Sequence, residues 1–155
     1  MNKRIAVFPG TFDPITLGHY DVIMRSLNLF DKIVIAIGKN SEKNNMFSIN
    51  KRKEWIQKTF LGFSKIEIDL FQGMTISFCI KKKAQFILRG LRDQLDFEFE
   101  RKVFYANREL ENRNCIETVF ILSSHGKSYI SSRIVREIIK NGGDYTIFVP
   151  PYVRI

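Results

Sequence analysis

Cysteine is scarce in this sequence, and its two copies form no recognisable pattern. Only Cys79 and Cys115 occur among the 155 residues, and they do not make a CxxC pair. This spacing matches neither a zinc site nor the disulfide framework of a small secreted protein. Redox and metal chemistry are therefore disfavoured, and both cysteines are expected simply to pack.

Long hydrophobic runs are also missing. The apolar run at residues 33–37 is far shorter than the roughly 20 residues that a membrane-spanning helix needs. Residues 1–20 contain no long apolar stretch behind a basic start, so no secretory signal is predicted. With 45% hydrophobic residues, a chain of this length can still build a core without disulfides or metals. We expect one soluble, cytoplasmic domain over residues 1–155, with no membrane partner.

Two common phosphate-binding motifs are absent as well. The sequence contains neither a Walker A motif (GxxxxGK[ST]) nor a GxGxxG fingerprint, so a nucleotide would need another binding arrangement. The 25 basic residues outnumber the 16 acidic ones and give a formal charge of +9. This excess fits an anionic partner such as nucleic acid, an anionic membrane or a phosphorylated small molecule. A generally basic, solvated surface is the alternative explanation and the one that such charge excess usually has.

The sequence does contain an alternation of strand-like and helix-like segments. Strands are predicted at residues 4–8, 33–37, 66–71, 86–88 and 118–122. Helices are predicted by apolar residues at helical spacing, over residues 16–30, 48–60, 75–82, 93–110 and 131–141. Either Ser48 or Asn50 can cap the second helix. This alternation predicts an α/β fold with a five-stranded parallel sheet and helices on both faces.

Four polar or glycine-containing segments should meet at one edge of this sheet. They follow the predicted strands, at residues 9–19, 38–45, 89–92 and 125–133. In open parallel sheets, ligands bind beyond the carboxyl ends of the strands, where such loops gather. Their convergence is the first indication of a functional site.

The segment at residues 9–19 (PGTFDPITLGH) is the most informative of the four. The first turn of the helix that follows contains Thr16, Gly18 and His19. Free N–H groups at a helix start attract an anion, and Gly18 lets a phosphate approach the backbone closely. His19 can then donate a hydrogen bond as charge develops in phosphoryl or nucleotidyl transfer. The alternative is that His19 only caps or packs the helix.

Arg89 and Arg92 flank a glycine directly after the fourth predicted strand. Their planar guanidinium groups suit bidentate contacts with phosphate better than lysine does. The alternative is that they form surface ion pairs with the acids that follow, at Asp93, Asp96 or Glu98.

Another helix start lies at residues 130–136 (ISSRIVR), and it carries two adjacent hydroxyl groups. Ser131 and Ser132, with the free N–H groups of the first turn, can hold the outer phosphates of a nucleotide. Plain N-capping needs only one of them, so that interpretation stays open. Lys39 and Lys43, in the loop after the second strand, are ambiguous in the same way.

These motifs together resemble a known superfamily. PGTFDP at residues 9–14, Thr16-x-Gly18-His19 and ISSxxxR at residues 130–136 resemble the T/HxGH and ISSTxxR signatures of the nucleotidyltransferases. The segment ILRGLRD, followed by DFEFE, is similar to bacterial phosphopantetheine adenylyltransferases in particular. The resemblance runs nearly end to end, and it implies a Rossmann-like single domain.

The resemblance also implies an activity. Members of this family transfer AMP from ATP to 4′-phosphopantetheine and give dephospho-CoA and pyrophosphate in coenzyme A synthesis. They use Mg²⁺, which is expected on the ATP phosphates because the sequence has no clustered carboxylates suited to a protein cage. A homohexamer is implied, with coenzyme A as a candidate feedback ligand and no nucleic-acid partner.

Site residues follow from the resemblance, position by position. His19 would stabilise the transition state, with Lys43 and Arg92 sharing the catalytic work. Phosphopantetheine would be bound by Thr11, Lys43, Thr75 and Arg89. ATP would be bound by Thr11, Phe12, His19, Gly90, Leu91, Arg92, Glu100, Lys127, Ser128, Tyr129, Ile130, Ser131, Ser132 and Arg133.

Some positions depart from the family pattern. Arg133 stands where threonine or serine is usual, and Lys127 replaces an aromatic residue near the serine motif. Residues 75–77 (TIS) replace bulkier or more polar residues along the predicted pantetheine arm.

Two alternative functions explain these motifs less well. Another acceptor within the superfamily, such as nicotinate mononucleotide, or CTP with glycerol phosphate, is disfavoured by the Arg-Gly-Leu-Arg segment. A basic, non-catalytic nucleic-acid binder leaves the TxGH segment and the paired serines unexplained. A direct in-line displacement is expected, because the acceptor phosphate is already anionic and needs no general base.

Overall fold

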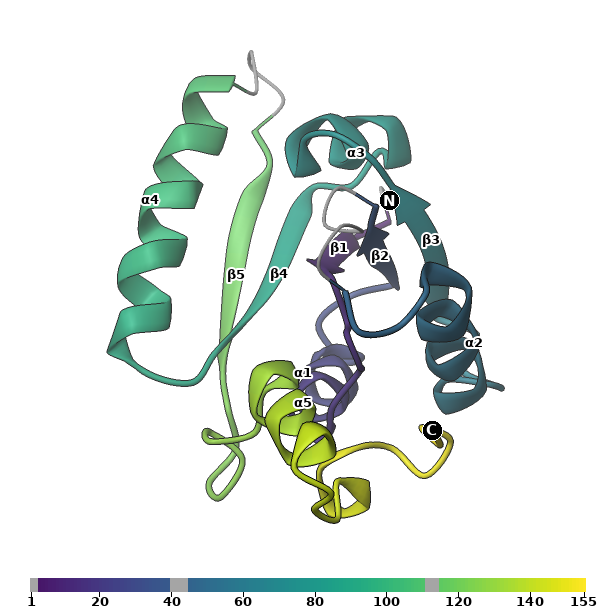
Figure 1. Cartoon of the computed structure of the whole chain (residues 1–155). Coiled ribbons are helices and arrows are strands. Elements are labelled where there is room, and N and C mark those ends of the chain that lie inside the picture. The colour runs from purple at the N-terminus through teal and green to yellow at the C-terminus, as the bar shows by residue number, and fades with distance from the viewer. Residues whose placement is uncertain (1–2, 40–44, 111–114) are drawn as a thin grey trace.

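Residues 3–39, 45–110 and 115–155 are described in the computed structural model, and they form the predicted alternation of strands and helices (Figure 1). The strands are β1 (Ile5–Gly10), β2 (Lys32–Gly38), β3 (Ile66–Phe71), β4 (Phe86–Leu91) and β5 (Glu117–Leu122). The helices are α1 (Leu17–Ser26), α2 (Ile49–Thr59), α3 (Thr75–Lys82), α4 (Gln94–Leu110), α5 (Ser132–Lys140) and the short 3-10 helix η2 (Thr146–Phe148).

The five strands form one parallel sheet in the order β3-β2-β1-β4-β5. The chain builds outward from β1 through β2 to β3, and then crosses to the other side of β1 for β4 and β5. The strand order therefore reverses between β1 and β4. In a Rossmann-like sheet, this switch point opens a crevice at the carboxyl ends of the strands.

Helices cover both faces of the sheet, as predicted. On one face, Ile23 of α1, Trp55 of α2 and Val135 of α5 join the core cluster that includes Ile35 of β2. The opposite face is covered by α3, whose buried residues pack with Val7, Val34 and Ile87, and by α4, whose Phe97 contacts Phe120 of β5. None of the described helices is long and apolar enough to cross a membrane.

The predicted end of the fourth strand is wrong. β4 continues through Leu91, because β5 pairs with it along this stretch. Arg89 pairs with Phe120 and Gly90 with Ile121. A Cβ on Gly90 would lie 2.9 Å from Val22 Cγ2, so this glycine allows α1 to pack closely on the strand.

Two other expectations are corrected. The first helix is predicted to reach residue 30, but α1 ends at Ser26. Beyond this end, the Leu29 N–H donates a hydrogen bond to the Ser26 carbonyl at 2.9 Å. Phe30 still packs in the core from beyond the helix. Cys79 is buried as expected, whereas Cys115 is exposed, because it lies ahead of β5 and outside both core clusters.

Candidate active site

A cavity of about 530 Å³ opens at the switch point between β1 and β4. Its wall combines the loop after β1, the start of α1, the end of β4, acidic residues of α4 and the start of α5. Three of the four segments predicted to converge thus meet here. The fourth contributes Gly38 to a neighbouring cavity, and residues 40–44 lie outside the described part of the chain.

His19 lies at the start of α1, where it shares a capping box with Thr16. Thr16 Oγ1 accepts the His19 N–H at 3.4 Å, and His19 Nδ1 accepts the Thr16 N–H at 3.0 Å. Glutamate or glutamine usually fills this position of a capping box. Because a backbone N–H can only donate, Nδ1 is the acceptor and Nε2 carries the proton. His19 therefore caps the helix and still offers Nε2–H to the cavity that it lines.

The same ring is kept uncharged by its surroundings. It packs edge-on against Phe12, with centroids 5.0 Å apart, and against Phe8 at 6.3 Å. Burial, together with the positive charges of Arg89 and Arg92, lowers the pKa of His19 from 6.5 to about 4. At neutral pH the ring is thus a neutral hydrogen-bond donor rather than a cation.

The His19 tautomer can be tested directly by NMR. Imidazole ¹H–¹⁵N spectra are expected to show a neutral Nε2–H ring that does not titrate between about pH 8 and pH 5.5. His125, the exposed second histidine, provides the reference signal. A midpoint near the usual histidine value of about 6.5, or an Nδ1–H ring, would contradict this arrangement.

Gly18 brings the two helix starts together. A Cβ at this position would lie 3.3 Å from the Ile130 carbonyl oxygen, so the missing side chain permits close contact with the segment before α5. His19 and Ser131 consequently line the same cavity. Close approach of a phosphate to Gly18 stays a prediction.

Arg89 and Arg92 are each paired with a carboxylate of α4. Arg89 Nε donates to Glu100 Oε1 at 2.9 Å, Nη2 contacts the same oxygen, and Nη1 donates to the Pro9 carbonyl at 2.8 Å. Arg92 Nε and Nη2 donate to the two oxygens of Asp96, both at 2.9 Å. The alternative that these arginines form ion pairs is confirmed for Arg92 with Asp96, while Arg89 takes the more distant Glu100.

The start of α5 contacts the loop after β1. Ser131, and not Ser132, caps the helix by accepting the Ile134 N–H at 3.3 Å. Ser132 Oγ instead donates to the Pro14 carbonyl at 2.7 Å. Arg133 is exposed on the cavity wall, in a first turn that carries no acidic residue. A cation at the positive end of a helix is unfavourable by itself, so its position suits a bound anion.

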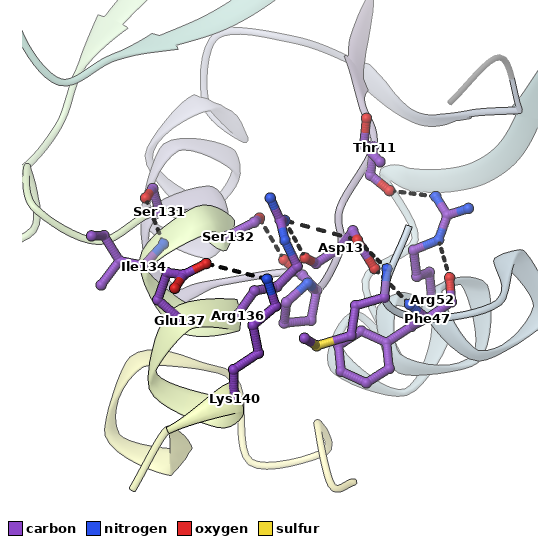
Figure 2. A network of polar contacts seen from close by, with 12 residues as sticks. Thr11, Asp13, Phe47, Arg52, Ser131, Ser132, Ile134, Arg136, Glu137 and Lys140 are labelled. Atoms are coloured by element: carbon purple, nitrogen blue, oxygen red, sulfur yellow. Dashed lines mark hydrogen bonds and ion pairs between the residues drawn. The ribbon is translucent and has the colours of Figure 1, made fainter. Parts of the chain in front are cut away.

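Asp13, on the wall of the first cavity, links three segments of the chain (Figure 2). The residue is only 2% exposed, and its carboxylate accepts the N–H groups of Met46 at 2.8 Å and Phe47 at 2.9 Å. Arg136 Nη1 of α5 donates to the Asp13 carbonyl at 2.7 Å and lies 3.8 Å from the carboxylate. Buried Arg52 of α2 continues these contacts by donating to the Phe47 carbonyl at 3.1 Å. The loop after β1, the entry to α2 and α5 are thereby held in one arrangement.

A second cavity, of about 490 Å³, adjoins the first on the face covered by α3 and α4. Most of its wall is apolar, and the polar side chains there include Thr75, Asn107 and Thr118. The two cavities share five wall residues: Pro9, Gly10, Thr11, Arg89 and Glu100. Two ligands bound in them would therefore meet beside Thr11 and Arg89.

Most of the predicted site residues lie on these walls. Of the residues predicted for ATP, the first cavity is lined by Thr11, Phe12, His19, Gly90, Arg92, Glu100, Ile130, Ser131, Ser132 and Arg133. Of those predicted for phosphopantetheine, the second is lined by Thr11, Thr75 and Arg89. Four predicted residues line neither cavity: Leu91, Lys127, Ser128 and Tyr129. Leu91 is buried, and Tyr129 packs beside Phe148. Lys43 lies outside the described residues.

Three charged residues on the first cavity's wall, Asp13, Asp96 and Arg136, were not predicted as part of the site. Asp13 and Arg136 belong to the PGTFDP and ISSxxxR motifs, so the motifs themselves were the available signal. The sequence predicts Asp96 only as an alternative surface ion-pair partner of Arg92.

Comparisons with known proteins identify a matching family and related sequences. The cytidylyltransferase-like family matches residues 7–138. The phosphopantetheine adenylyltransferase of Flavobacterium psychrophilum is 51% identical over 152 residues, covering 98% of this chain and 99% of that protein. The phosphopantetheine adenylyltransferase of Syntrophotalea carbinolica is 41% identical, covering 99% of this chain and 92% of that protein.

Solved structures share the fold at much lower identity. A Vibrio parahaemolyticus protein assigned as a nicotinate-nucleotide adenylyltransferase superposes with a TM-score of 0.68 at 21% identity, over 97% of this chain and 95% of that one. A bifunctional NMN adenylyltransferase/ADP ribose pyrophosphatase from Francisella tularensis gives 0.70 at 16% identity, over 96% of this chain and 45% of that one. At these identities the likeness concerns the fold alone.

Proposed function

The chain belongs to the cytidylyltransferase-like family and, within it, to the phosphopantetheine adenylyltransferases, and on that premise we propose how its two cavities perform the reaction. The enzyme transfers AMP from ATP to 4′-phosphopantetheine, and the products are dephospho-CoA and pyrophosphate. This reaction is a step of coenzyme A biosynthesis.

The observation that carries the proposal is the meeting of the two cavities. ATP occupies the first cavity, where His19, Arg92 and the starts of α1 and α5 face its phosphates. The pantetheine arm lies in the second cavity against its largely apolar wall and Thr75. The acceptor phosphate then reaches Thr11 and Arg89, which belong to both walls. This placement brings a phosphate oxygen next to the α-phosphorus of ATP.

The chemistry is a direct in-line displacement. An oxygen of the acceptor phosphate forms a bond with the α-phosphorus, and the bond from that phosphorus to the bridging oxygen of pyrophosphate breaks. No proton has to be removed from the nucleophile, so positioning and charge stabilisation supply the acceleration. His19 donates Nε2–H to a non-bridging α-phosphate oxygen, while Arg92 and the predicted Lys43 balance the developing charge.

Mg²⁺ enters this scheme as part of the nucleotide substrate. Within the described ranges, no three His, Cys, Asp or Glu side chains form a group that could hold a metal ion. The acids on the first cavity's wall, Asp13, Asp96 and Glu100, are each paired with an arginine. We therefore propose that the ion is held by the ATP phosphates, whose charge it partly neutralises.

A product assay tests the proposed function. Purified protein, MgATP and 4′-phosphopantetheine are expected to give equal amounts of dephospho-CoA and pyrophosphate. Parallel reactions contain nicotinate mononucleotide with ATP, or glycerol phosphate with CTP, and little turnover is expected in either. Preferred turnover of one of those acceptors, or salt-dependent nucleic-acid binding without any product, would overturn the proposal.

We also propose an assembly, a feedback ligand and a location for this chain. The exposed apolar residues of α4, among them Leu95, Phe99 and Tyr105, suit burial between copies in a homohexamer. Light scattering is expected to give six times the 18.2 kDa chain mass.

Coenzyme A contains the whole product and would span both cavities as a competitive feedback ligand. Because the substrates are cytoplasmic metabolites, we place the enzyme in the cytoplasm.

A further inference from the structure

Helix α4 presents two carboxylates on one face, and each holds an arginine of the site. Asp96 and Glu100 are four residues apart, so they lie one above the other on the helix. Asp96 pairs with Arg92, and Glu100 pairs with Arg89. Both carboxylates and both arginines line the first cavity. The helix therefore contacts Arg89 of β4 and Arg92, which directly follows β4, at two successive points.

The Asp96 pair fixes the plane of the Arg92 guanidinium. Nε donates to Oδ2 and Nη2 donates to Oδ1, both at 2.9 Å, which is a bidentate contact along one edge of the group. A guanidinium has five N–H donors, and this contact uses two of them. The three remaining N–H donors, two on Nη1 and one on Nη2, lie along the other edges of the guanidinium. The hydrogen bonds from Arg92 lower the pKa of Asp96, so the carboxylate is charged at neutral pH.

The position of this pair points to the nucleotide. Arg92 and Asp96 line only the first cavity, whereas Arg89 and Glu100 line both. We propose that Asp96 is the positioning residue of Arg92, and that it orients the free edge of the guanidinium toward the triphosphate of ATP. This inference rests on the proposed function, because it takes the first cavity as the ATP site.

A purely structural role for Asp96 would involve the start of α4. Asp93 Oδ1 accepts the Asp96 N–H at 2.9 Å, and Asp96 Oδ2 accepts the Arg92 backbone N–H at 2.9 Å. The first bond uses the Asp96 backbone and not its side chain, and the second needs one oxygen acceptor on the Asp96 side chain and no charge. Asp96→Asn keeps such an acceptor and removes the negative charge and one of the two side-chain acceptors for Arg92. The substitution therefore separates orientation of Arg92 from capping of the helix.

Steady-state kinetics of Asp96→Asn test the inference. KM for ATP is expected to rise roughly tenfold, because a charged hydrogen-bonding partner of Arg92 is lost. Turnover should also fall severalfold, because Arg92 balances charge that develops in the transition state. KM for 4′-phosphopantetheine should change by less than about twofold, because neither Arg92 nor Asp96 lines the second cavity. In an Arg92→Ala background, Asp96→Asn should change KM for ATP by less than about twofold, because there is no guanidinium left to orient.

A matched control comes from the same helix. Glu98 pairs with Arg101 at 2.9 Å and lines neither cavity, so Glu98→Gln should leave all constants unchanged. An unchanged or lower KM for ATP in Asp96→Asn, a parallel rise of both KM values, or full additivity with Arg92→Ala would overturn the inference. Calorimetric titration with a nonhydrolysable ATP analogue measures the same affinity change without acceptor. Failure of the wild-type product assay would instead refute the proposed function.

Discussion

Replacing His19 with alanine is expected to lower kcat by about 10² to 10³-fold. The variant loses the Nε2–H donor that faces the first cavity, at the point where charge develops on the α-phosphate. Substrate KM values should change much less, because the hydrogen bond strengthens in the transition state. Steady-state rates of dephospho-CoA formation measure the effect, and turnover within about threefold of the wild type would contradict the assigned role.

The capping role of His19 calls for a second variant as a control. Alanine also removes the acceptor for the Thr16 N–H, and loss of such a cap destabilises by about 1 kcal/mol. Glutamine is the usual residue at this position of a capping box, so His19→Gln should restore the melting temperature. We expect it not to restore turnover to the wild-type level. Recovery of both properties would show that the loss in His19→Ala came from the helix start.

Asp13→Ala is expected to lower the free energy of unfolding by about 3–5 kcal/mol. The substitution leaves the N–H groups of Met46 and Phe47 without their carboxylate acceptors and removes the buried counter-charge of Arg136. Urea denaturation followed by circular dichroism measures the change. Asp13→Asn retains the shape and one acceptor, and a smaller loss of about 1–3 kcal/mol is expected for it.

A surface aspartate provides the control for Asp13. Asp31 also accepts a backbone N–H, from Arg4 at 2.8 Å, but the contact is exposed. Asp31→Asn should therefore leave the urea midpoint essentially unchanged. Asp13→Ala should also lower kcat/KM for both substrates, because three segments around the cavities lose their common anchor. A stability loss in Asp13→Ala no larger than in the Asp31 variant would contradict this role.

Secondary structure was predictable where local pattern and tertiary packing agree. The bounds of β3 and α3 match the prediction, because the apolar residues of β3 pack partly buried against the core and the apolar stripe of α3 is buried. β4 was predicted too short, since Arg89 and Gly90 suggest the end of a strand. Only pairing with β5, about 30 residues later in the chain, extends the ladder through them.

The site was predictable from motifs, but its internal contacts were not. The predicted convergence of the TxGH and serine segments is observed, since His19, Ser131 and Arg133 line one cavity, while their roles stay predictions. The role of Asp13 depends on partners 33 and 123 residues away in sequence, whose approach only the folded chain determines. The pairing of Arg89 with Glu100 likewise requires α4 to lie across β4. Sequence spacing alone favoured nearer acids.

The most direct test of the central claim is a crystal structure with a nonhydrolysable ATP analogue and Mg²⁺. We expect the triphosphate in the cavity between β1 and β4, with His19 Nε2 within about 3.2 Å of a non-bridging α-phosphate oxygen. Binding of the triphosphate elsewhere, or an imidazole beyond hydrogen-bond distance of the α-phosphate, would contradict the proposed catalytic arrangement.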